Sequence, residues 1–359
     1  MKKIVAINGE SWAKNLTGIE RVAQDTVTYL DKICSPNEFE LVVPKNILRP
    51  AEFTNIKIVQ LNTEARFFPK WTQFDFQSYV LKNRRLSFDF SNTCPYFAPG
   101  IEYLHDIYAK LYPSDFTQTK RDRLIHLYSV LMYKRIARRA KKIIAVSEYT
   151  KQTIVQTYKT PESKIEVVYD GLGTYRDIVQ DDSVFARLLQ GKKLQKGKYY
   201  FTLGSLSTRK NLKWIASHAE LYPQEIFAVS GKPIPSVVAP ELQKLNSLKN
   251  VVMTGYLTDG EVKALLANCK AFVLPSYFEG FGLPPLEALS CGAKIIISNR
   301  TSLPEIYKNF AYYIEPDNPD VNLDDLLSKP VEPPAELLKT LTLENTARRL
   351  YQIIKDVNK

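Results

Sequence analysis

The sequence predicts an α/β protein with two doubly wound domains that face a central cleft. Its 359 residues suit two domains of about 150 residues each. Short apolar runs alternate with helical stretches along the chain, as they do where helices cover a parallel sheet. The runs are continuous rather than alternating, which is typical of strands buried on both faces. In such domains ligands bind at the carboxyl ends of the strands.

Each predicted element has a local reason. The predicted strands are short runs that are rich in Val, Ile, Phe and Tyr. They lie at residues 2–8, 39–43, 56–61, 102–105 and 142–146 in the first half, and at 199–204, 226–230, 251–254, 271–275 and 294–298 in the second. Between most of them apolar residues recur with the helical period, at residues 18–32, 117–141, 211–220 and 259–268.

Composition along the chain predicts the domain boundaries. The stretch at 172–197 is rich in glycine and lysine and lacks a buried-strand pattern, so it is predicted to be a linker. It separates an N-terminal domain at residues 1–171 from a C-terminal domain at 198–334. Residues 335–359 form a further helical stretch, which could pack back over either domain.

Composition also excludes several classes of protein. With 45% hydrophobic and 24% charged residues, the chain is not disordered, collagenous or a coiled coil. No apolar window is long enough to predict a transmembrane helix, and the apolar run after Lys3 is too short for a signal peptide. The four cysteines are widely spaced and only three histidines are present, so no zinc site is expected. These features predict a protein of the reducing cytoplasm.

Absent motifs and the charge balance narrow the chemistry further. No G-x-G-x-x-G or P-loop motif occurs, which counts against nicotinamide, flavin and P-loop enzymes. The formal net charge is +11, and residues 1–180 carry 27 Lys and Arg against 19 Asp and Glu. A basic first half suits an acidic partner such as a phospholipid surface, a diphosphate or a nucleic acid.

The densest group of functional candidates follows a predicted strand of the second half. A loop there carries Glu279, Gly280 and Gly282, and a helix is predicted to begin at Pro284. Glycines let backbone N–H groups approach a ligand closely, and a helix N-terminus favours an anion. On this prediction Glu287 lies in the first turn of the helix. The alternative is a plain strand–loop–helix connection with a capping glutamate.

The sequence E-G-F-G-L-P-P-L-E, from Glu279 to Glu287, resembles the E-x7-E motif of the retaining glycosyltransferases of family four. This resemblance implies the GT-B fold, in which two Rossmann-like domains face a donor cleft. It also implies that Glu279 is catalytic and that Glu287 holds the nucleotide ribose. The implied donor-binding residues of this segment are Gly280, Phe281, Gly282, Leu283 and Glu287.

A second segment is similar to the same family. Residues 203–212, L-G-S-L-S-T-R-K-N-L, resemble its strand-to-helix segment, where a basic pair meets the donor diphosphate. Arg209 and Lys210 precede a predicted helix, so side-chain cations and backbone N–H groups converge on one anion. Many relatives carry arginine where this chain has Ser205, an implied donor-binding position. Lys210 is therefore the first catalytic candidate here and Arg209 the second, and a solvated helix start is the alternative.

Two residues of the first half complete the implied site. Gly18, in T-G-I-E-R, is similar to the family's glycine loop that faces the donor phosphate and the acceptor. His105, in Y-L-H-D at the end of a predicted strand, matches the family's histidine over the donor sugar. A glycine also serves a plain turn, and a lone histidine is more often a core residue. The whole resemblance extends from about residue 4 to residue 316.

The resemblance implies a metal-independent, retaining hexosyltransferase whose donor is a nucleotide diphosphate sugar and which uses no cofactor. Mannose is the favoured sugar, with rhamnose, glucose and galactose as alternatives. The implied acceptor is a glycan or lipid-linked glycan of a growing cell-surface polysaccharide. No D-x-D metal motif occurs, and the basic pair would neutralise the leaving diphosphate. The rival functions are a GT-B sugar-nucleotide epimerase, whose S-G-G signature is absent, and a non-catalytic nucleotide-sugar-binding module.

A strongly basic segment runs from Lys120 to Lys142, with nine Lys and Arg against one acid, Asp122. Two interpretations stay open: a core helix with a solvated basic face, and a helix that docks on anionic lipid. The second would place a cytoplasmic protein on the inner face of the plasma membrane. No nucleic-acid motif accompanies the charge, so no nucleic-acid partner is expected.

Overall fold

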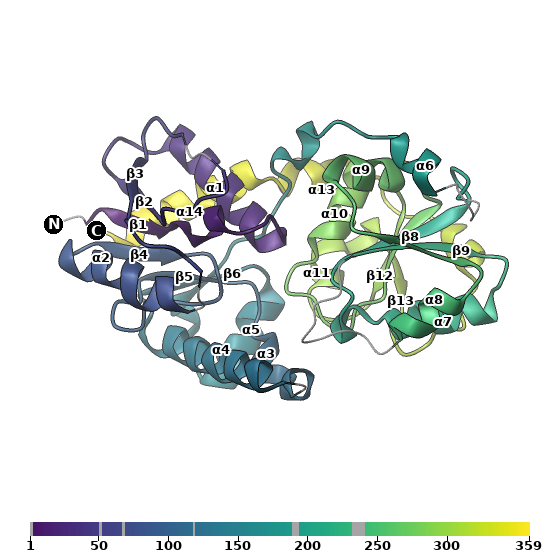
Figure 1. The fold of residues 1–359 in the computed structure, drawn as a ribbon, viewed down its shortest axis with the longest axis horizontal. Helices are drawn as coiled ribbons and strands as arrows, with labels where there is room; N and C mark the ends of the chain where they lie inside the picture. Colours follow the sequence, from purple (N-terminus) through teal and green to yellow (C-terminus); the bar gives the residue numbers. More distant parts are fainter. Residues whose placement is uncertain (1–2, 50–51, 67–68, 118, 189–193, 232–240) are drawn as a thin grey trace. The chain divides into compact units, whose positions relative to one another are not determined.

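The computed structural model describes residues 3–49, 52–66, 69–117, 119–188, 194–231 and 241–359. The chain divides into two compact units. The first contains residues 1–113, 123–173 and 341–359, and the second contains residues 114–122 and 174–340. Each unit is built on one parallel β-sheet with helices on both faces (Figure 1). The predicted α/β, doubly wound architecture is therefore confirmed for both units.

The sheet of the first unit has the strand order β3-β2-β1-β4-β5-β6-β7. Its strands are β1 (Val5–Asn8), β2 (Phe39–Val43), β3 (Lys57–Gln60), β4 (Leu86–Asp89), β5 (Ile101–Leu104), β6 (Lys142–Ala145) and β7 (Ile165–Val167). All residues of β1, β2, β4 and β5 are buried, because helices cover both faces of the sheet. The strand order reverses between β1 and β4, which is where ligands bind in open α/β sheets.

The helices of the first unit are held on this sheet by apolar packing. They are α1 (Gly18–Ile33), α2 (Gln77–Lys82), α3 (Tyr108–Leu111), α4 (Lys120–Arg139), whose first turn is grouped with the second unit, α5 (Glu148–Tyr158) and α14 (Leu343–Val357). The π-helix η2 (Trp71–Phe76) leads directly into α2. Trp71, Phe76 and Val80 pack with Ala6 and Val42 of the sheet in one buried cluster, which fixes both elements on the sheet.

The sheet of the second unit has the order β10-β9-β8-β11-β12-β13. Its strands are β8 (Tyr199–Leu203), β9 (Ile226–Ser230), β10 (Val251–Gly255), β11 (Ala271–Leu274), β12 (Ile295–Ser298) and β13 (Tyr312–Ile314). Its helices are α6 (Ser183–Leu188), α7 (Leu212–Leu221), α8 (Leu242–Ser247), α9 (Asp259–Asn268), α10 (Leu283–Ser290), α11 (Leu303–Tyr307), α12 (Leu323–Leu327) and α13 (Ala335–Thr340). Because β8 and β11 are neighbours, the loops that follow them leave the same edge of the sheet.

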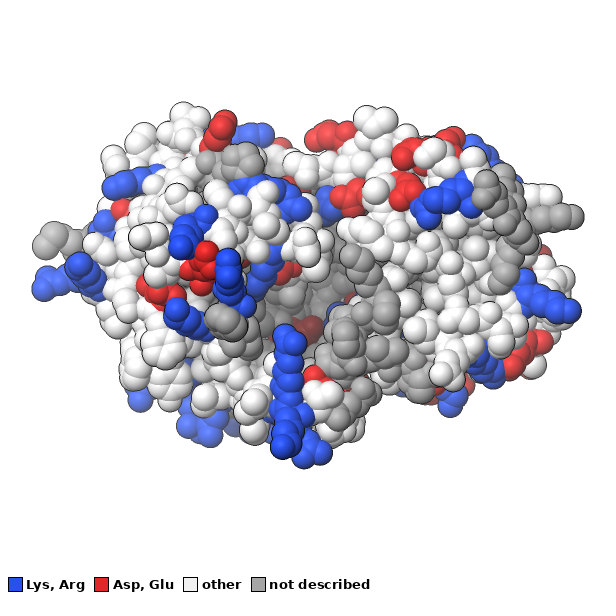
Figure 2. Space-filling view, in the orientation of Figure 1, with Lys and Arg blue, Asp and Glu red and all other residues white. Residues whose placement is uncertain are grey.

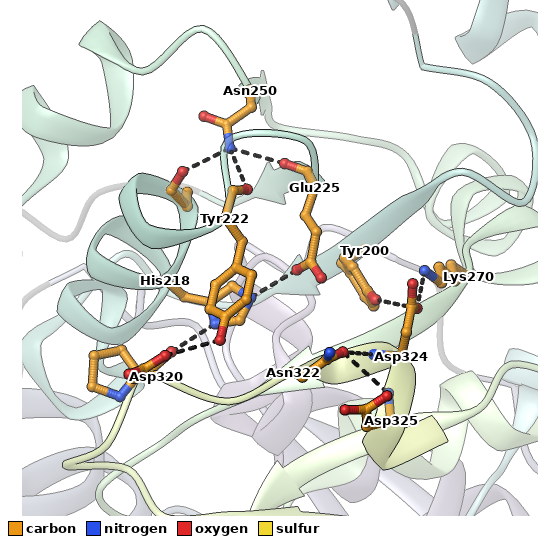
Figure 3. A network of polar contacts seen from close by, with 12 residues as sticks. Tyr200, His218, Tyr222, Glu225, Asn250, Lys270, Asp320, Asn322, Asp324 and Asp325 are labelled. Atoms are coloured by element: carbon orange, nitrogen blue, oxygen red, sulfur yellow. Dashed lines mark hydrogen bonds and ion pairs between the residues drawn. The ribbon is translucent and has the colours of Figure 1, made fainter. Parts of the chain in front are cut away.

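A buried histidine fixes loops of the second unit to helix α7 (Figure 3). His218 stacks between Trp214 and Tyr222, with ring centroids 4.7 and 4.6 Å from its own. Its two ring nitrogens face the carbonyl oxygen of Pro319 and the carboxylate of Glu225, each at 2.7 Å. Because both ring nitrogens have partners and the side chain is fully buried, we assign His218 to the fold.

The predicted linker at residues 172–197 is wrong for most of its described part. From Thr174 onward the chain belongs to the second unit. Tyr175 and Phe185 are buried, and the ring centroid of Phe185 lies 6.4 Å from that of Tyr199 in β8. Lys263 of α9 donates a hydrogen bond to the carbonyl oxygen of Ile178 at 2.7 Å. Apolar and polar contacts therefore anchor this stretch despite its glycine and lysine content, and residues 189–193 lie outside the described residues.

The helical stretch predicted at 335–359 is two helices that belong to different units. Helix α13 is part of the second unit, and α14 is part of the first. Between them Leu341 accepts a hydrogen bond from Leu172 at 3.0 Å, and Leu343 donates one to the Leu172 carbonyl oxygen at 3.0 Å. Thr342 caps α14 by accepting a hydrogen bond from the Asn345 N–H. This bridge interrupts the helical period and returns the chain to the first unit.

Candidate active site

The loop after β11 carries the predicted glutamate and is shaped by one glycine. Helix α10 begins at Leu283, one residue earlier than predicted, and Gly282 precedes it with a φ of 91°. A side chain is strained at this φ, and a Cβ atom there would lie 2.6 Å from Cδ2 of Leu303. Gly282 therefore allows the chain to turn from the loop into α10 against α11.

Hydrogen bonds from α11 and from the residue before it hold this loop in place. The Ser302 hydroxyl donates to the carbonyl oxygens of Glu279 and Phe281 at 3.0 and 3.3 Å. The Tyr307 hydroxyl donates to the carbonyl oxygen of Gly282. Ser302 and Tyr307 are both buried, so the loop backbone is fixed from its inner side.

A buried ion pair joins the two predicted segments of the second unit. Nζ of Lys210 lies 2.6 Å from Oε1 of Glu279, and the hydroxyl of Ser276 donates to the same oxygen at 2.7 Å. The side chains of Lys210 and Glu279 are only 10% and 6% exposed. Burial disfavours the charged carboxylate, but the charges of Lys210 and Arg209 outweigh it and lower the pKa of Glu279. Glu279 is therefore an ionised carboxylate in a nearly dry site.

The backbone around Lys210 is built to aim its side chain at this loop. Asn211 adopts a left-handed conformation with φ 54° and donates hydrogen bonds to the carbonyl oxygens of Pro275 and Pro316 at 3.0 and 2.8 Å. The N–H of Tyr277 donates to the carbonyl oxygen of Arg209 at 2.9 Å. These bonds join the segment after β8 to the loop after β11. The predicted basic pair and the predicted glutamate thus share one site.

Close backbone packing supports the start of the basic segment. Gly204 follows β8 directly, and a Cβ atom on Gly231 would lie 1.8 Å from the Gly204 carbonyl oxygen. Glycine is therefore required at residue 231, because a side chain there would keep the loop after β9 from approaching the loop after β8. Ser205 is half-buried beside this contact, and its hydroxyl lies 3.1 Å from that of Ser207. Arg209 is also half-buried, and the structure places it in the same segment as Lys210.

Glu287 lies further along α10 than predicted. It is the fifth residue of the helix and not part of the first turn, because the helix begins at Leu283. It is half-buried, and its carbonyl oxygen accepts a hydrogen bond from the Ser290 hydroxyl at 2.7 Å. The first turn of α10 contains no acidic residue. Any anion near that N-terminus is thus not opposed by a carboxylate of the first turn.

In the first unit, His105 follows β5 and is held by a buried aspartate. Its Nε2 donates to the carbonyl oxygen of Phe90 at 2.8 Å, and its Nδ1 lies 3.8 Å from Oδ2 of Asp170. Tyr103 donates to the other oxygen of Asp170 at 2.5 Å. Burial disfavours the imidazolium, but Asp170 and the Phe90 carbonyl outweigh it and raise the pKa of His105. The backbone N–H of His105 donates to Asn92.

The sequence prediction did not include Asp170 and Asn92 in the site. Asp170 follows β7, whereas His105 follows β5, and β6 lies between these strands in the sheet. Carboxyl ends of parallel strands share one edge, so an acidic residue after a nearby strand was the available signal. The structure shows the Asp170 carboxylate facing the histidine.

Gly18 is the first residue of α1 and is exposed. Thr17, the residue before it, forms a capping box with Glu20 of the first turn, in which the Thr17 N–H donates to the Glu20 carboxylate at 3.3 Å. Gly18 and His105 belong to the first unit. The remaining predicted residues belong to the second: Ser205, Arg209, Lys210, Glu279, Gly280, Phe281, Gly282, Leu283 and Glu287.

The described residues contain neither a metal-ligand cluster nor a membrane-spanning helix. Within those ranges no three His, Cys, Asp or Glu side chains come together as metal ligands would. Over the same part of the chain, no helix has both the length and the apolar character needed to cross a bilayer. The charged groups that the described structure gathers at the β8–β11 edge are Arg209, Lys210 and Glu279. They are suited to bind an anion and a hydroxyl group side by side.

Two family models match this chain. Residues 94–176 match the model described as Glycosyltransferase Family 4, and residues 188–331 match the model described as Glycosyl transferases group 1. The first match contains His105, and the second contains Lys210 and Glu279.

Two curated relatives share part of their length with this chain. The serotype-specific mannosyltransferase WbdA of Escherichia coli is 31% identical over 177 residues, which are 47% of this chain and 22% of WbdA. The O-antigen chain mannosyltransferase RfbU of Salmonella typhimurium is 26% identical over 239 residues, which are 66% of this chain and 62% of RfbU. This chain thus spans less than two thirds of the length of either relative.

A solved structure resembles the whole chain. Sucrose-phosphate synthase from Thermosynechococcus elongatus is 14% identical, with a TM-score of 0.66 over 99% of this chain and 96% of that chain. This likeness, together with the two parallel sheets, shows the GT-B architecture of two Rossmann-like domains.

Proposed function

This chain belongs to the family 4 and group 1 glycosyltransferases, and from that membership we propose that it transfers mannose with retention from a nucleotide diphosphate sugar to a lipid-linked, cell-surface glycan. The bond from the anomeric carbon to the diphosphate breaks. The bond to the acceptor oxygen forms on the same face of the sugar, and the acceptor proton leaves with the departing phosphate.

The observation that carries this proposal is the buried pair of Lys210 and Glu279 at the edge where β8 and β11 end. Negative charge grows on the leaving diphosphate as the sugar becomes oxocarbenium-like. Lys210 and Arg209 supply fixed positive charge for it. Glu279 holds the Lys210 ammonium in place before the donor arrives, so little reorganisation is needed during the reaction. The free oxygen of the same carboxylate would accept a hydrogen bond from a sugar hydroxyl.

His105 is proposed to contact the sugar and not to transfer a proton. Its Nε2 proton is held by the Phe90 carbonyl, and its Nδ1 faces Asp170. Both nitrogens are thus engaged within the first unit, and the ring has a fixed orientation. Asp170 is a positioning residue in this proposal.

The sugar and the acceptor are proposed from the relatives. WbdA and RfbU are named mannosyltransferases, and the name of RfbU refers to the O-antigen chain. Mannose is therefore preferred to rhamnose, glucose and galactose, and a lipid-linked O-antigen or capsular glycan is preferred as the acceptor. We also propose that the reaction needs no metal ion, because Lys210 and Arg209 can balance the charge of the diphosphate.

Kinetics of transfer from GDP-mannose test the site. Lys210→Met should lower kcat by about 10²- to 10³-fold, the usual effect of removing one fixed donor from a developing anion. Glu279→Gln should also abolish most of the transfer, since the Lys210 ammonium loses the carboxylate that holds it in place. Lys213→Met and Glu220→Gln are matched controls on exposed positions of α7 and should keep wild-type turnover. Wild-type kcat in Lys210→Met would contradict the assignment.

Nucleotide binding and product analysis separate the remaining alternatives. Thermal unfolding with GDP, UDP or dTDP, with and without EDTA, should show stabilisation by GDP that EDTA does not change. At 100 times its dissociation constant a ligand adds about 2.7 kcal/mol to stability. Binding without transfer would favour a nucleotide-sugar-binding module, and a new sugar nucleotide without glycan product would favour an epimerase. Retention requires the same anomeric configuration in the donor and in the product, measured by NMR.

A further inference from the structure

Helix α4 exposes a row of leucines to solvent. Leu124, Leu127 and Leu131 are 67%, 63% and 48% exposed. Their spacing of three and four residues places them on one side of the helix, and we call them the leucine stripe. Large apolar side chains in a contiguous exposed row are unusual on a water-soluble surface and indicate an interaction site.

Cations continue the leucine stripe along the same face. Lys134 and Arg138 follow Leu131 at the same spacing of three and four residues, and both are exposed. Arg123 and Arg139 are exposed beside the row. In Figure 2 blue side chains are seen along the lower edge of the first unit, where Figure 1 places α4. The acid of this helix, Asp122, is buried, so it does not offset the positive charge of the surface.

The opposite side of α4 already has its partners. Met132, Tyr133, Ile136 and Ala137 are buried. The Tyr128 hydroxyl accepts a hydrogen bond from Gln73 of η2 at 2.7 Å. The helix is thus firmly attached to the first unit by one face, and the outward position of the leucine stripe is not a consequence of poor packing.

Two exposed aromatic residues lie on segments that are bonded to α4. Arg135 of α4 donates to the carbonyl oxygen of Tyr96 at 2.7 Å, and its guanidinium lies 4.4 Å from the centroid of that ring. Phe97 follows Tyr96 in the chain and is 70% exposed. Phe74 follows Gln73, the residue that donates to α4, and is 66% exposed. Two further exposed apolar side chains thus lie on segments that are hydrogen-bonded to α4.

We propose that this surface docks the protein on an anionic lipid bilayer, with the leucine stripe in the acyl region and Lys134 and Arg138 at the phosphate groups. An amphipathic helix binds a membrane interface when apolar side chains and cations share its outward face. A second copy of this chain is a poorer occupant. Parallel or antiparallel pairing of two α4 helices would bring cations of one copy against cations of the other. The proposal is independent of which sugar is transferred.

Co-sedimentation of the full chain with vesicles tests this proposal. Wild-type protein should bind vesicles that contain phosphatidylglycerol and bind vesicles of pure phosphatidylcholine much more weakly. The triple variant Leu124→Ser, Leu127→Ser and Leu131→Ser should lower the partition coefficient at least about tenfold. Lys134→Ala with Arg138→Ala should lower it roughly tenfold at about 0.1 M salt and have less effect at higher salt.

Matched controls and a second measurement make the outcome decisive. Leu221→Ser removes a leucine that is 53% exposed in the second unit and should leave binding unchanged. Circular dichroism should show that every variant keeps the wild-type helix content. Absence of wild-type binding to the anionic vesicles, or unchanged binding of the triple leucine variant, would overturn the proposal. A dimer in sedimentation equilibrium that the triple variant dissociates would also overturn it, in favour of contact between two copies.

Discussion

Glu279 and Glu102 are both buried carboxylates, but their surroundings move their pKa values in opposite directions. Burial disfavours ionised Glu279, and the charges of Lys210 and Arg209 reverse this effect and lower its pKa. Burial and the charge of Asp89 raise the pKa of Glu102 well above its ordinary value. In the folded state Glu279 is therefore a carboxylate, whereas Glu102 keeps its proton to a higher pH than it does in the unfolded chain.

Unfolding measured against pH should separate these two residues. Glu279→Gln should destabilise the protein at neutral pH by about 3–5 kcal/mol, because Lys210 stays buried without its partner. The folded pKa of Glu279 lies below its unfolded value, so the advantage of wild type is complete above about pH 4.3 and disappears as the pH falls through the folded pKa. Urea unfolding at a series of pH values gives this difference directly.

Glu102→Gln is the contrasting variant in the same experiment. The folded pKa of Glu102 lies above its unfolded value, so wild type matches the variant below about pH 4.3 and loses up to about 1.4 kcal/mol per pH unit above it. The two differences should thus change with pH in opposite directions. Parallel curves for the two variants would show that Lys210 and Arg209 do not govern the charge of Glu279.

At the residue scale the sequence predicted identities better than contacts. Lys210 and Glu279 were both named from their motifs, but they are 69 residues apart, and their contact depends on β8 and β11 being neighbours. No local pattern encodes that neighbourhood. Asp170 was missed for the same reason, since its partner His105 lies on another strand end. The roles of these residues in catalysis stay predictions that the kinetic variants test.

Helix α10 has a glycine with positive φ at each end, and the two glycines differ in their surroundings. Gly282 precedes the helix with φ 91°, and Gly292 follows it with φ 80°. A Cβ atom on Gly282 would lie 2.6 Å from Leu303, whereas one on Gly292 would meet nothing within 4 Å. The N-terminal end of α10 is therefore fixed by steric contact as well as by backbone conformation.

Replacing Gly282 and Gly292 by alanine, one at a time, should show how much the steric contact with Leu303 contributes. Gly292→Ala should cost about 1 kcal/mol of stability, the typical price of a left-handed alanine, and leave turnover unchanged. Gly282→Ala adds the clash with Leu303 and should cost about 2–3 kcal/mol. It should also lower kcat, because Glu279 lies on the displaced loop. Thermal unfolding and initial rates measure both effects.

The double variant Gly282→Ala with Leu303→Ala provides the internal check. It removes the atom that a new Cβ atom would meet, so the loss in kcat should be partly restored even though Leu303→Ala by itself creates a cavity. Equal effects of Gly282→Ala and Gly292→Ala on turnover would show that steric contact at the loop does not position Glu279.

Elements with a strong local pattern were predicted, and weakly patterned ones were not. The continuous apolar runs of β1, β2, β8 and β11 were all assigned to strands. Strand β4 was missed because it contains Ser87 and Asp89, which look like solvent-facing residues although both are buried. Strand β13 is only three residues long, too short to give a period. Tertiary burial, which the local sequence does not encode, decided the case of β4.

At the scale of the whole molecule, α14 makes the first unit discontinuous in sequence. The helix packs against α1 and buries Leu343, Leu350, Ile353 and Ile354. Its Tyr351 donates to Glu38 at 2.6 Å. A domain assignment from composition could not foresee this, because the linker and the terminal helix are recognisable only by what they pack against.

Truncation after Thr340 should therefore unfold the first unit and spare the second. Removing the buried leucines and isoleucines of α14 costs on the order of 6–12 kcal/mol, which is comparable to the stability of a whole domain. Calorimetry should show loss of one unfolding transition and retention of the other. Leu337→Ala in α13 is the opposite control and should shift only the transition of the second unit. Two intact transitions in the truncated chain would contradict this division.

The late return of the chain to the first unit also has a consequence for synthesis on the ribosome. Residues 174–340 emerge after most of the first unit and before α14. At about 5–20 residues per second, synthesis of residues 174–340 takes roughly 10–30 s. During this time α14 is not yet present to pack against the apolar side of α1. All residues of the second unit, 114–122 and 174–340, have emerged before α14, so the second unit can finish folding first. The nascent first unit, in which the side of α1 that packs against α14 is still uncovered, is the part of the molecule that we expect chaperones to bind during translation.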